Sequence, residues 1–201
     1  MSEHYLLKRV TAPVNFPVTV DQIKLDLRLQ YDAEDSIITS IIQAATDYVD
    51  VPRGVINKAL ITQTWKLSAR GFDNGRIDIP VSPVQSIESI EYFDVNDEVQ
   101  TIDADNFYLY GDEDSAWLQA KTAFAMPAFF DRLDAVNITF IAGFGDTAED
   151  IPASISQALR MLCAFWFENR SAVAVGAGLV VTELPLAVQS LISINRKGWV
   201  G

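Results

Sequence analysis

The stretch PASISQALRMLCAFWFEN, at residues 152–169, decides how the rest of the chain is interpreted. With a rotation of about 100° per residue, one face of a helix here carries Ala158 and four large apolar side chains, Ile155, Leu159, Leu162 and Trp166. Other apolar residues flank this face, and only a narrow stripe is polar. A helix of this kind is normally central, with other elements packed on most of its surface. We therefore predict that these four residues form the core of a central helix.

Two further helices are predicted around it. Over residues 33–51, apolar residues occupy one side and polar residues the other, which is typical of an amphipathic surface helix. Asp32 is its expected N-cap, and Pro52 favours its end. A last helix is expected over residues 186–196, introduced by Pro185.

The segment TVDQIKLDLRL, at residues 19–29, carries two conflicting signals. Its isoleucine and leucines alternate with charged residues, which is a strand pattern. Thr19 and Gln22, however, fit a capping box at the start of a helix, and the interior contains good helix formers. The residues alone leave helix and strand open.

Between residues 60 and 142 the pattern changes to short β-prone runs separated by turn residues. The predicted strands are residues 61–67, 76–79, 86–93, 99–102, 107–110 and 136–142. This region lies between helical segments, so we predict an α+β fold: a small helical bundle with an antiparallel β region inserted between its second and third main helices. The predicted parts are an N-terminal helical part (1–58), a β insertion (59–145) and a C-terminal helical part (146–201).

The segment SAVAVGAGLVVT, at residues 171–182, is an apolar connection after the central helix. The two β-prone runs on either side of its glycines could pair as a hairpin. A soluble monomer rarely exposes such a segment, so it either folds back on the core or is covered by another subunit.

Composition indicates a soluble, unexported protein with a packed core. The chain has 201 residues, 49% of them hydrophobic, and neither an apolar run long enough for a bilayer nor a signal peptide is expected. Cys163 is the only cysteine, so no internal disulfide is expected. The net charge of -12 argues against a protein that binds phosphates strongly.

The residues for catalysis or metal binding are largely missing. The only histidine, His4, lies near a terminus, and Cys163 has no histidine beside it in sequence. Acidic clusters at 112–114 and 146–150 lack the ligand spacing of a calcium loop, and we interpret them as solvated loop charges. The Gly-Phe-Gly run at 143–145 lacks a third glycine, which favours a turn over a phosphate-binding loop. We predict no catalytic, cofactor-binding or metal-ligating residue, and no cofactor.

A series of packing and turn signals runs through most of the chain. They are VDQIKLDLRL at 20–29, the helix at 35–49, ALITQTW at 59–65, PVQSI at 83–87, the strand and turn at 136–145 leading into Ile151-Pro152, FWFENR at 165–170, and ELP at 183–185. In this order and spacing, the series resembles the head-tail connector (adaptor) proteins of long-tailed phages, prophages and gene transfer agents. The resemblance favours a helix for residues 19–29.

The resemblance implies a structural virion protein without enzymatic activity. Such proteins form a ring, commonly of twelve subunits, below the portal protein, and they join the DNA-filled head to the downstream neck or tail protein. DNA passes through the ring without specific binding, and no membrane is involved. The expected location is the virion neck, with assembly in the host cytoplasm.

A ring requires two non-identical faces on each subunit that meet head to tail. We assign part of one face to the apolar connection at 171–182. The candidate interface residues are Val173, Val175, Gly176, Gly178, Leu179 and Val181.

Three other functions are open on the sequence. The chain could be a different neck component, such as a head-closure or tail-terminator protein. It could bind a sugar or another small ligand through Tyr108, Tyr110 and Trp117, although packing is the simpler interpretation of these aromatics. An enzyme would depend on the acidic clusters alone.

Overall fold

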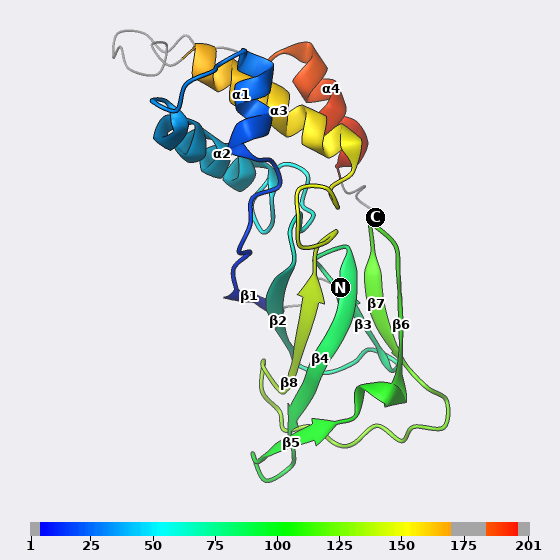
Figure 1. The fold of residues 1–201 in the computed structure, drawn as a ribbon. Helices are drawn as coiled ribbons and strands as arrows, with labels where there is room; N and C mark the ends of the chain where they lie inside the picture. Colours follow the sequence, from blue (N-terminus) through cyan, green and yellow to red (C-terminus); the bar gives the residue numbers. More distant parts are fainter. Residues whose placement is uncertain (1–4, 170–183, 197–201) are drawn as a thin grey trace, which may run out of the picture. The chain divides into compact units, whose positions relative to one another are not determined.

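The computed structural model describes residues 5–169 and 184–196, and it divides the chain into two compact units (Figure 1). The helical unit comprises Val14–Ile61 and Gly145–Gly201, and the β unit comprises Met1–Pro13 and Thr62–Phe144. One unit contains helices and the other antiparallel sheets. The predicted α+β class is therefore confirmed.

The helical unit is organised around one helix, α3 (Ala153–Glu168). Each of the other three helices, α1 (Val20–Leu27), α2 (Asp35–Val49) and α4 (Leu186–Asn195), contacts it (Figure 1). The side chains that α3 buries include Ala158, which lies on the predicted apolar face, and Cys163, which flanks it. The apolar surface around most of its circumference is explained by these three neighbours.

The sequence alone left helix and strand open for residues 19–29. The structure forms helix α1 in this segment, as the family resemblance favoured. The Thr19 hydroxyl accepts a hydrogen bond from the Gln22 amide (3.2 Å), and the Gln22 side chain accepts one from the Thr19 amide (2.9 Å). The helix ends at Leu27, and its C-cap residue, Arg28, has a left-handed φ of 56°. Ile23 is buried whereas Leu25 is 75% exposed, so the alternating leucines do not mark a buried strand face.

Helix α2 begins at Asp35, two residues later than predicted, and Asp32 does not cap it. The Lys24 ammonium of α1 lies 2.5 Å from a carboxylate oxygen of Asp32 and 3.0 Å from one of Asp35. The ion pair with Lys24 lowers the pKa of Asp32 and raises the pKa of Lys24. Asp32, the residue expected to cap α2, therefore forms an ion pair with Lys24 of α1 instead.

The β unit contains two antiparallel sheets (Figure 1). The larger has the order β1 (Leu6–Thr11), β2 (Gln63–Ala69), β8 (Val136–Ala142), β4 (Val84–Phe93), β5 (Val99–Ile102). The smaller has the order β3 (Arg76–Ile79), β7 (Ala116–Ala120), β6 (Phe107–Gly111), and a 3-10 turn at Ala104–Asn106 precedes β6. The bounds of β3, β5 and β8 agree with the prediction. The core of the larger sheet includes Trp65, Leu67, Ile90, Ile138 and Phe140.

Two strands were not predicted. Leu6–Thr11 forms β1 and pairs with β2, which corrects the expectation that residues 1–58 belong to the helical part. The Arg9 guanidinium lies over the Trp65 ring, 4.9 Å from its centroid. The partner strand, β2, is more than fifty residues away from β1 in the sequence, so local periodicity could not indicate that the two strands pair. The second strand, β7, is a short run that completes a hairpin with β6.

Candidate assembly surfaces

The predicted subunit interface lies outside the described residues. This applies to Val173, Val175, Gly176, Gly178, Leu179 and Val181. It stays a prediction. The surfaces considered below belong to residues 5–169 and 184–196.

The four predicted core residues of the central helix are placed as follows. Ile155, Leu159 and Leu162 are fully buried in the helical unit. Trp166 is half-buried, and its ring meets the Tyr48 ring of α2 edge-on, with 6.0 Å between the centroids. The same helix therefore supplies core side chains at its start and an aromatic contact near its end.

A charged contact joins α3 to α1. Arg160 donates from Nε to Asp26 Oδ2 at 2.7 Å, and its terminal nitrogen contacts the other carboxylate oxygen. This bidentate arrangement raises the pKa of Arg160. Both side chains are less than one third exposed. The pair fixes the orientation of α1 on the central helix.

The structure gives no chemical role to Cys163. The thiol is buried, and burial raises its pKa to about 12. A thiol with this pKa is protonated at neutral pH. It therefore serves as a small apolar residue of the helical core.

The two acidic clusters organise turns. In the β6–β7 turn, Asp112 Oδ1 accepts hydrogen bonds from the amides of Asp114 and Ser115, each at 2.8 Å. In the helical unit, Asp150 Oδ2 accepts from the amide and hydroxyl of Thr147, and these bonds lower the pKa of Asp150. Within the described part of the chain, no group of three or more metal-ligating side chains is found. In each cluster, one carboxylate therefore stabilises the turn in which it lies.

The glycine run at 143–145 lies in the segment of the chain that follows β8 and leads to α3. The Gly143 amide donates to the Pro83 carbonyl (2.9 Å), and the Gly143 carbonyl accepts from the Gln85 side chain (2.9 Å). Gly143 has a φ of 137°, a conformation that other residues rarely adopt. The backbone groups of Gly143 are used within the fold, in agreement with a turn.

The outward face of the small sheet carries the three aromatics proposed as a ligand platform. Tyr110 and Trp117 stack with 5.6 Å between ring centroids, and Tyr108 lies next to Tyr110. The Arg76 guanidinium covers the Trp117 ring at 4.6 Å, and the Lys121 ammonium lies 5.0 Å from the Tyr108 centroid. A sugar platform needs an open ring face. Because two of the three rings already stack with cations, the arrangement favours packing.

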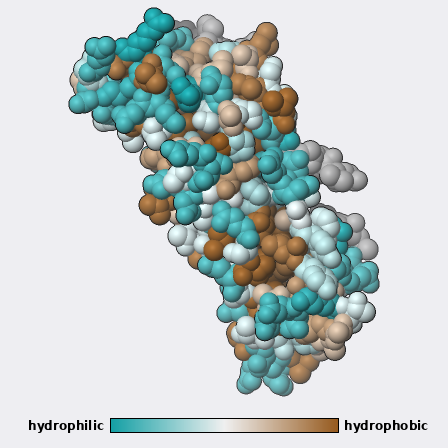
Figure 2. Space-filling view, turned by 45° about the vertical axis from the view of Figure 1, so that its right-hand side comes forward, coloured by the Kyte–Doolittle hydropathy of each residue, from teal (hydrophilic) through white to brown (hydrophobic). Residues whose placement is uncertain are grey.

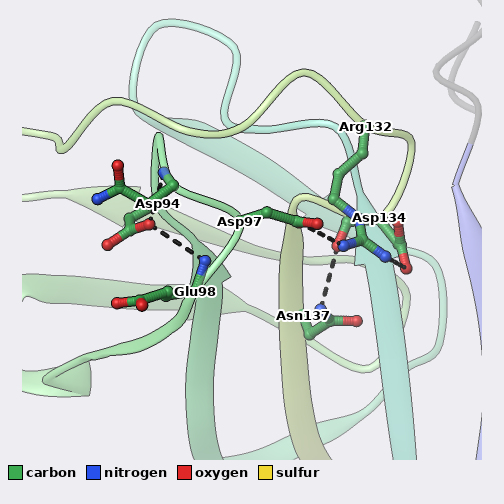
Figure 3. A network of polar contacts seen from close by, with 7 residues as sticks. Asp94, Asp97, Glu98, Arg132, Asp134 and Asn137 are labelled. Carbon is green, nitrogen blue, oxygen red and sulfur yellow. Dashed lines mark hydrogen bonds and ion pairs between the residues drawn. The ribbon is translucent and has the colours of Figure 1, made fainter.

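A polar network joins the β4–β5 turn to the start of β8 (Figure 3). Arg132 donates to Asp97 (2.7 Å) and, through two nitrogens, to Asp134 (2.7 and 3.0 Å), and its guanidinium lies over the Phe93 ring. Arg132 lowers the pKa of Asp134. Asn137 donates to the Asp134 carbonyl at 3.1 Å. The network links the β4–β5 turn to the residues that lead into β8.

The turn itself is organised by Asp94 (Figure 3). Its Oδ1 accepts from the amides of Asn96 (2.8 Å) and Glu98 (3.2 Å), and its Oδ2 accepts from the Gln100 side chain. The Asn96 amide is the main cause of a lowered pKa at Asp94. These hydrogen bonds hold the β4–β5 turn together.

Exposed apolar side chains are a further feature of the surface that could take part in assembly. Figure 2 shows one patch of hydrophobic residues on the β unit, and further hydrophobic residues are scattered over the rest of the visible surface. In this unit a pocket of about 390 Å³ is lined by Val84 of β4, Leu109 and Tyr110 of β6, and the acidic residues Asp112 and Glu113 of the following turn. Exposed apolar surface with a polar rim is typical of a protein interaction site.

Comparison with known proteins supplies the context for these surfaces. Residues 17–101 match the family of phage gp6-like head-tail connector proteins. The chain resembles the phage head-tail connectors. The family resemblance inferred from the sequence is confirmed. No curated protein matches the chain.

Solved structures of gene transfer agent particles are similar over almost the whole chain. A chain in the neck of an empty particle, computed with C6 symmetry, has a TM-score of 0.77 at 24% identity. A chain in the virion of the native particle has a TM-score of 0.76 at 25% identity, and one in the native neck, computed with C12 symmetry, has 0.66 at 24% identity. Each match covers 98% of this connector-like chain and 97% of the other chain.

Among the described helices, none combines the length and the apolar composition needed to span a bilayer.

Proposed function

We propose that the chain is a head-tail connector, a structural protein of the neck of a phage-like particle. The observation that carries this function is a likeness to neck chains over 98% of the sequence, together with the family match. These findings agree with the connector function and the neck location that the sequence predicted. The polypeptide acts by contacting copies of itself and its neighbours.

The ring is proposed to contain twelve copies, and the support is a related neck that was computed with C12 symmetry. Its neighbours are a portal protein on the head side and a neck or tail protein on the other side. DNA passes through the hole. A chain of net charge -12 suits this passage because acidic surfaces repel phosphates.

A non-enzymatic role is part of the proposal. The single cysteine is buried and protonated, and Asp112 and Asp150, one carboxylate from each acidic cluster, accept hydrogen bonds from neighbouring backbone amides. Neither arrangement supplies a positioned nucleophile or base.

The finer architecture is also proposed: a small helical bundle into which the β unit is inserted between α2 and α3. Support comes from the chain path, since the helical unit is made of two segments on either side of residues 62–144. The insertion would let the β unit vary without changing the helical frame.

The apolar connection at 171–182 is the first proposed contact between neighbouring copies. Replacing Val173, Val175, Leu179 and Val181 with Ser is expected to impair ring assembly more than folding. The two effects separate if native mass spectrometry is combined with circular dichroism. Rings that persist unchanged after all four replacements would remove this segment from the interface.

Labelling tests the proposed location. A tagged chain, visualised with a gold probe in purified particles, is expected to lie between head and tail. A label at the distal side of the neck would indicate a head-closure or tail-terminator protein, and a label elsewhere on the particle would contradict the proposal.

A further inference from the structure

We propose that neighbouring copies join by strand addition, with β1 of one copy pairing along the outer edge of β6 in the next copy. Among the described residues, no strand pairs with β6 on that side. The inference rests on the proposed ring and names a contact that forms it. An added strand gains backbone hydrogen bonds along an existing edge.

The two sheets of the β unit end in four edges, and two of them are short. β3 and β5 have four residues each. Very short edge strands are one means by which proteins protect sheet edges, because they offer few backbone groups to an added strand. These two edges are therefore poor sites for strand addition.

The other two edges expose apolar side chains. On β1, Leu6 is 64% exposed and Val10 is also exposed, and on β6 the exposed side chains are Tyr108, Leu109 and Tyr110. The strands have similar lengths, six and five residues. An exposed apolar edge of this length is a template for pairing with another chain.

The backbone direction of β6 is set by its hydrogen bonds with β7. The Lys121 amide donates to the Asn106 carbonyl (2.9 Å), and the Asp112 amide donates to the Ser115 carbonyl (2.8 Å). In an antiparallel pair, backbone groups alternate between the partner strand and the opposite edge. The amide and carbonyl of Leu109 therefore point to the edge that an incoming strand would occupy.

Charge complementarity selects β1 as the incoming strand. The charged residues of β1 are Lys8 and Arg9, both cationic, in a chain of net charge -12. The turn after β6 carries Asp112, Glu113 and Asp114. A cationic strand that pairs beside an acidic turn is steered to it and held in register.

The position of the two edges suits a ring. β1 and β6 lie on opposite sides of the β unit (Figure 1). Contacts between two different surfaces are head-to-tail, and they close into a ring when the rotation between copies allows. The pocket lined by Val84 and Leu109 lies beside β6 and offers space for an apolar side chain of β1.

Disulfide trapping tests the contact in the full chain. Cysteine is placed at Leu6, Lys8 or Val10, and in the same chain at Tyr108, Leu109 or Tyr110. Paired strands bring Cα atoms to about 4.5–5.5 Å, which a disulfide can span. The native Cys163 is buried and serves as an internal control.

Oxidation is carried out on purified rings and on intact particles. At least one pair is expected to give a ladder of multimers, whereas each single-cysteine variant gives dimers at most. Rings or particles that contain the protein but give no ladder with any pair would overturn the strand contact and leave the connector function intact. A chain that forms no ring and enters no particle would contradict both.

A charge exchange supplies a second, independent test. Lys8→Glu or Glu113→Lys alone is expected to raise the concentration needed for half-assembly at least about fivefold, and the double variant is expected to return it to within about twofold of wild type. Circular dichroism checks that each variant is folded. If the double variant does not assemble at a lower concentration than the single variants, the pairing of β1 with β6 is refuted. The pairing is also refuted if the substitutions change only portal binding.

Discussion

The central place of α3 in the helical unit predicts a large effect for Leu162→Ala. Leu162 is fully buried and lies on the face that the sequence assigned to the core. The substitution removes three carbon atoms from this site, whereas α3 itself is retained because alanine is the best helix former. The matched control is Leu186→Ala in α4, where the side chain is 80% exposed.

The magnitude follows from two contributions. Burial of each methylene is worth about 0.8 kcal/mol, which gives about 2.4 kcal/mol for the atoms removed. A remaining void on the order of 50 Å³ adds about 1.2 kcal/mol. We therefore expect the free energy of unfolding of the helical unit to fall by about 3.5 kcal/mol, against less than about 0.5 kcal/mol for the exposed control.

Urea unfolding followed by circular dichroism at 222 nm measures this difference, because the helices dominate the signal. With a slope of about 1.5 kcal/mol per molar urea, the midpoint is expected to fall by roughly 2.3 M for Leu162→Ala. A change below about 0.5 kcal/mol at Leu162, or an equal cost at Leu186, would refute the reasoning that α3 is the core of its unit.

Three further predictions follow from individual contacts. Asp26→Asn breaks the bidentate contact with Arg160 and is expected to cost about 1 kcal/mol in urea unfolding, with less effect at 1 M NaCl; an equal cost at both salt concentrations would contradict an ionic contribution. Because Arg132 lowers the pKa of Asp134, this ion pair stabilises the β unit above about pH 4, the ordinary pKa of aspartate, and the contribution is lost as the pH falls through the lower folded-state value. Asp134→Asn is therefore expected to flatten the acid side of the thermal stability profile relative to Asp78→Asn, and an unchanged acid slope would be the contrary result. Cys163, with a pKa of about 12, is expected to resist iodoacetamide at pH 8 until urea unfolds the chain, and rapid labelling of the native protein would show that the thiol is accessible.

The elements that the sequence predicted well have strong local periodicity. The central helix was predicted over residues 152–169 and occupies Ala153–Glu168, and β8 was predicted with its observed bounds. In both cases a long run of residues faces one core, so that the apolar pattern repeats with the period of the element.

The elements that the sequence left open or missed depend on distant partners. β1 becomes a strand because β2 lies beside it, and this pairing joins residues that are far apart in the chain. In α1, Leu25 is exposed although it is apolar, so hydropathy alone suggested a strand. Asp32 had the position of an N-cap, but Lys24 of the preceding helix competes for its carboxylate.

The candidate contact surfaces show the same distinction. The apolar composition of residues 171–182 is visible in the sequence, and it suggested an interface. The edges of β1 and β6 could not be inferred, because an edge is defined only when the order of all strands is known. The opposite charges of Lys8 and of the acidic turn at 112–114 suggest a contact only once the order of the strands is known.

The central claim is that this chain acts by assembling into a ring that joins a portal to a tail. Electron microscopy of the purified chain, mixed with a portal protein, tests it most directly. The account predicts closed rings of connector subunits bound coaxially to the portal. Monomers that stay separate from the portal, or a complete particle neck that lacks this chain, would contradict it.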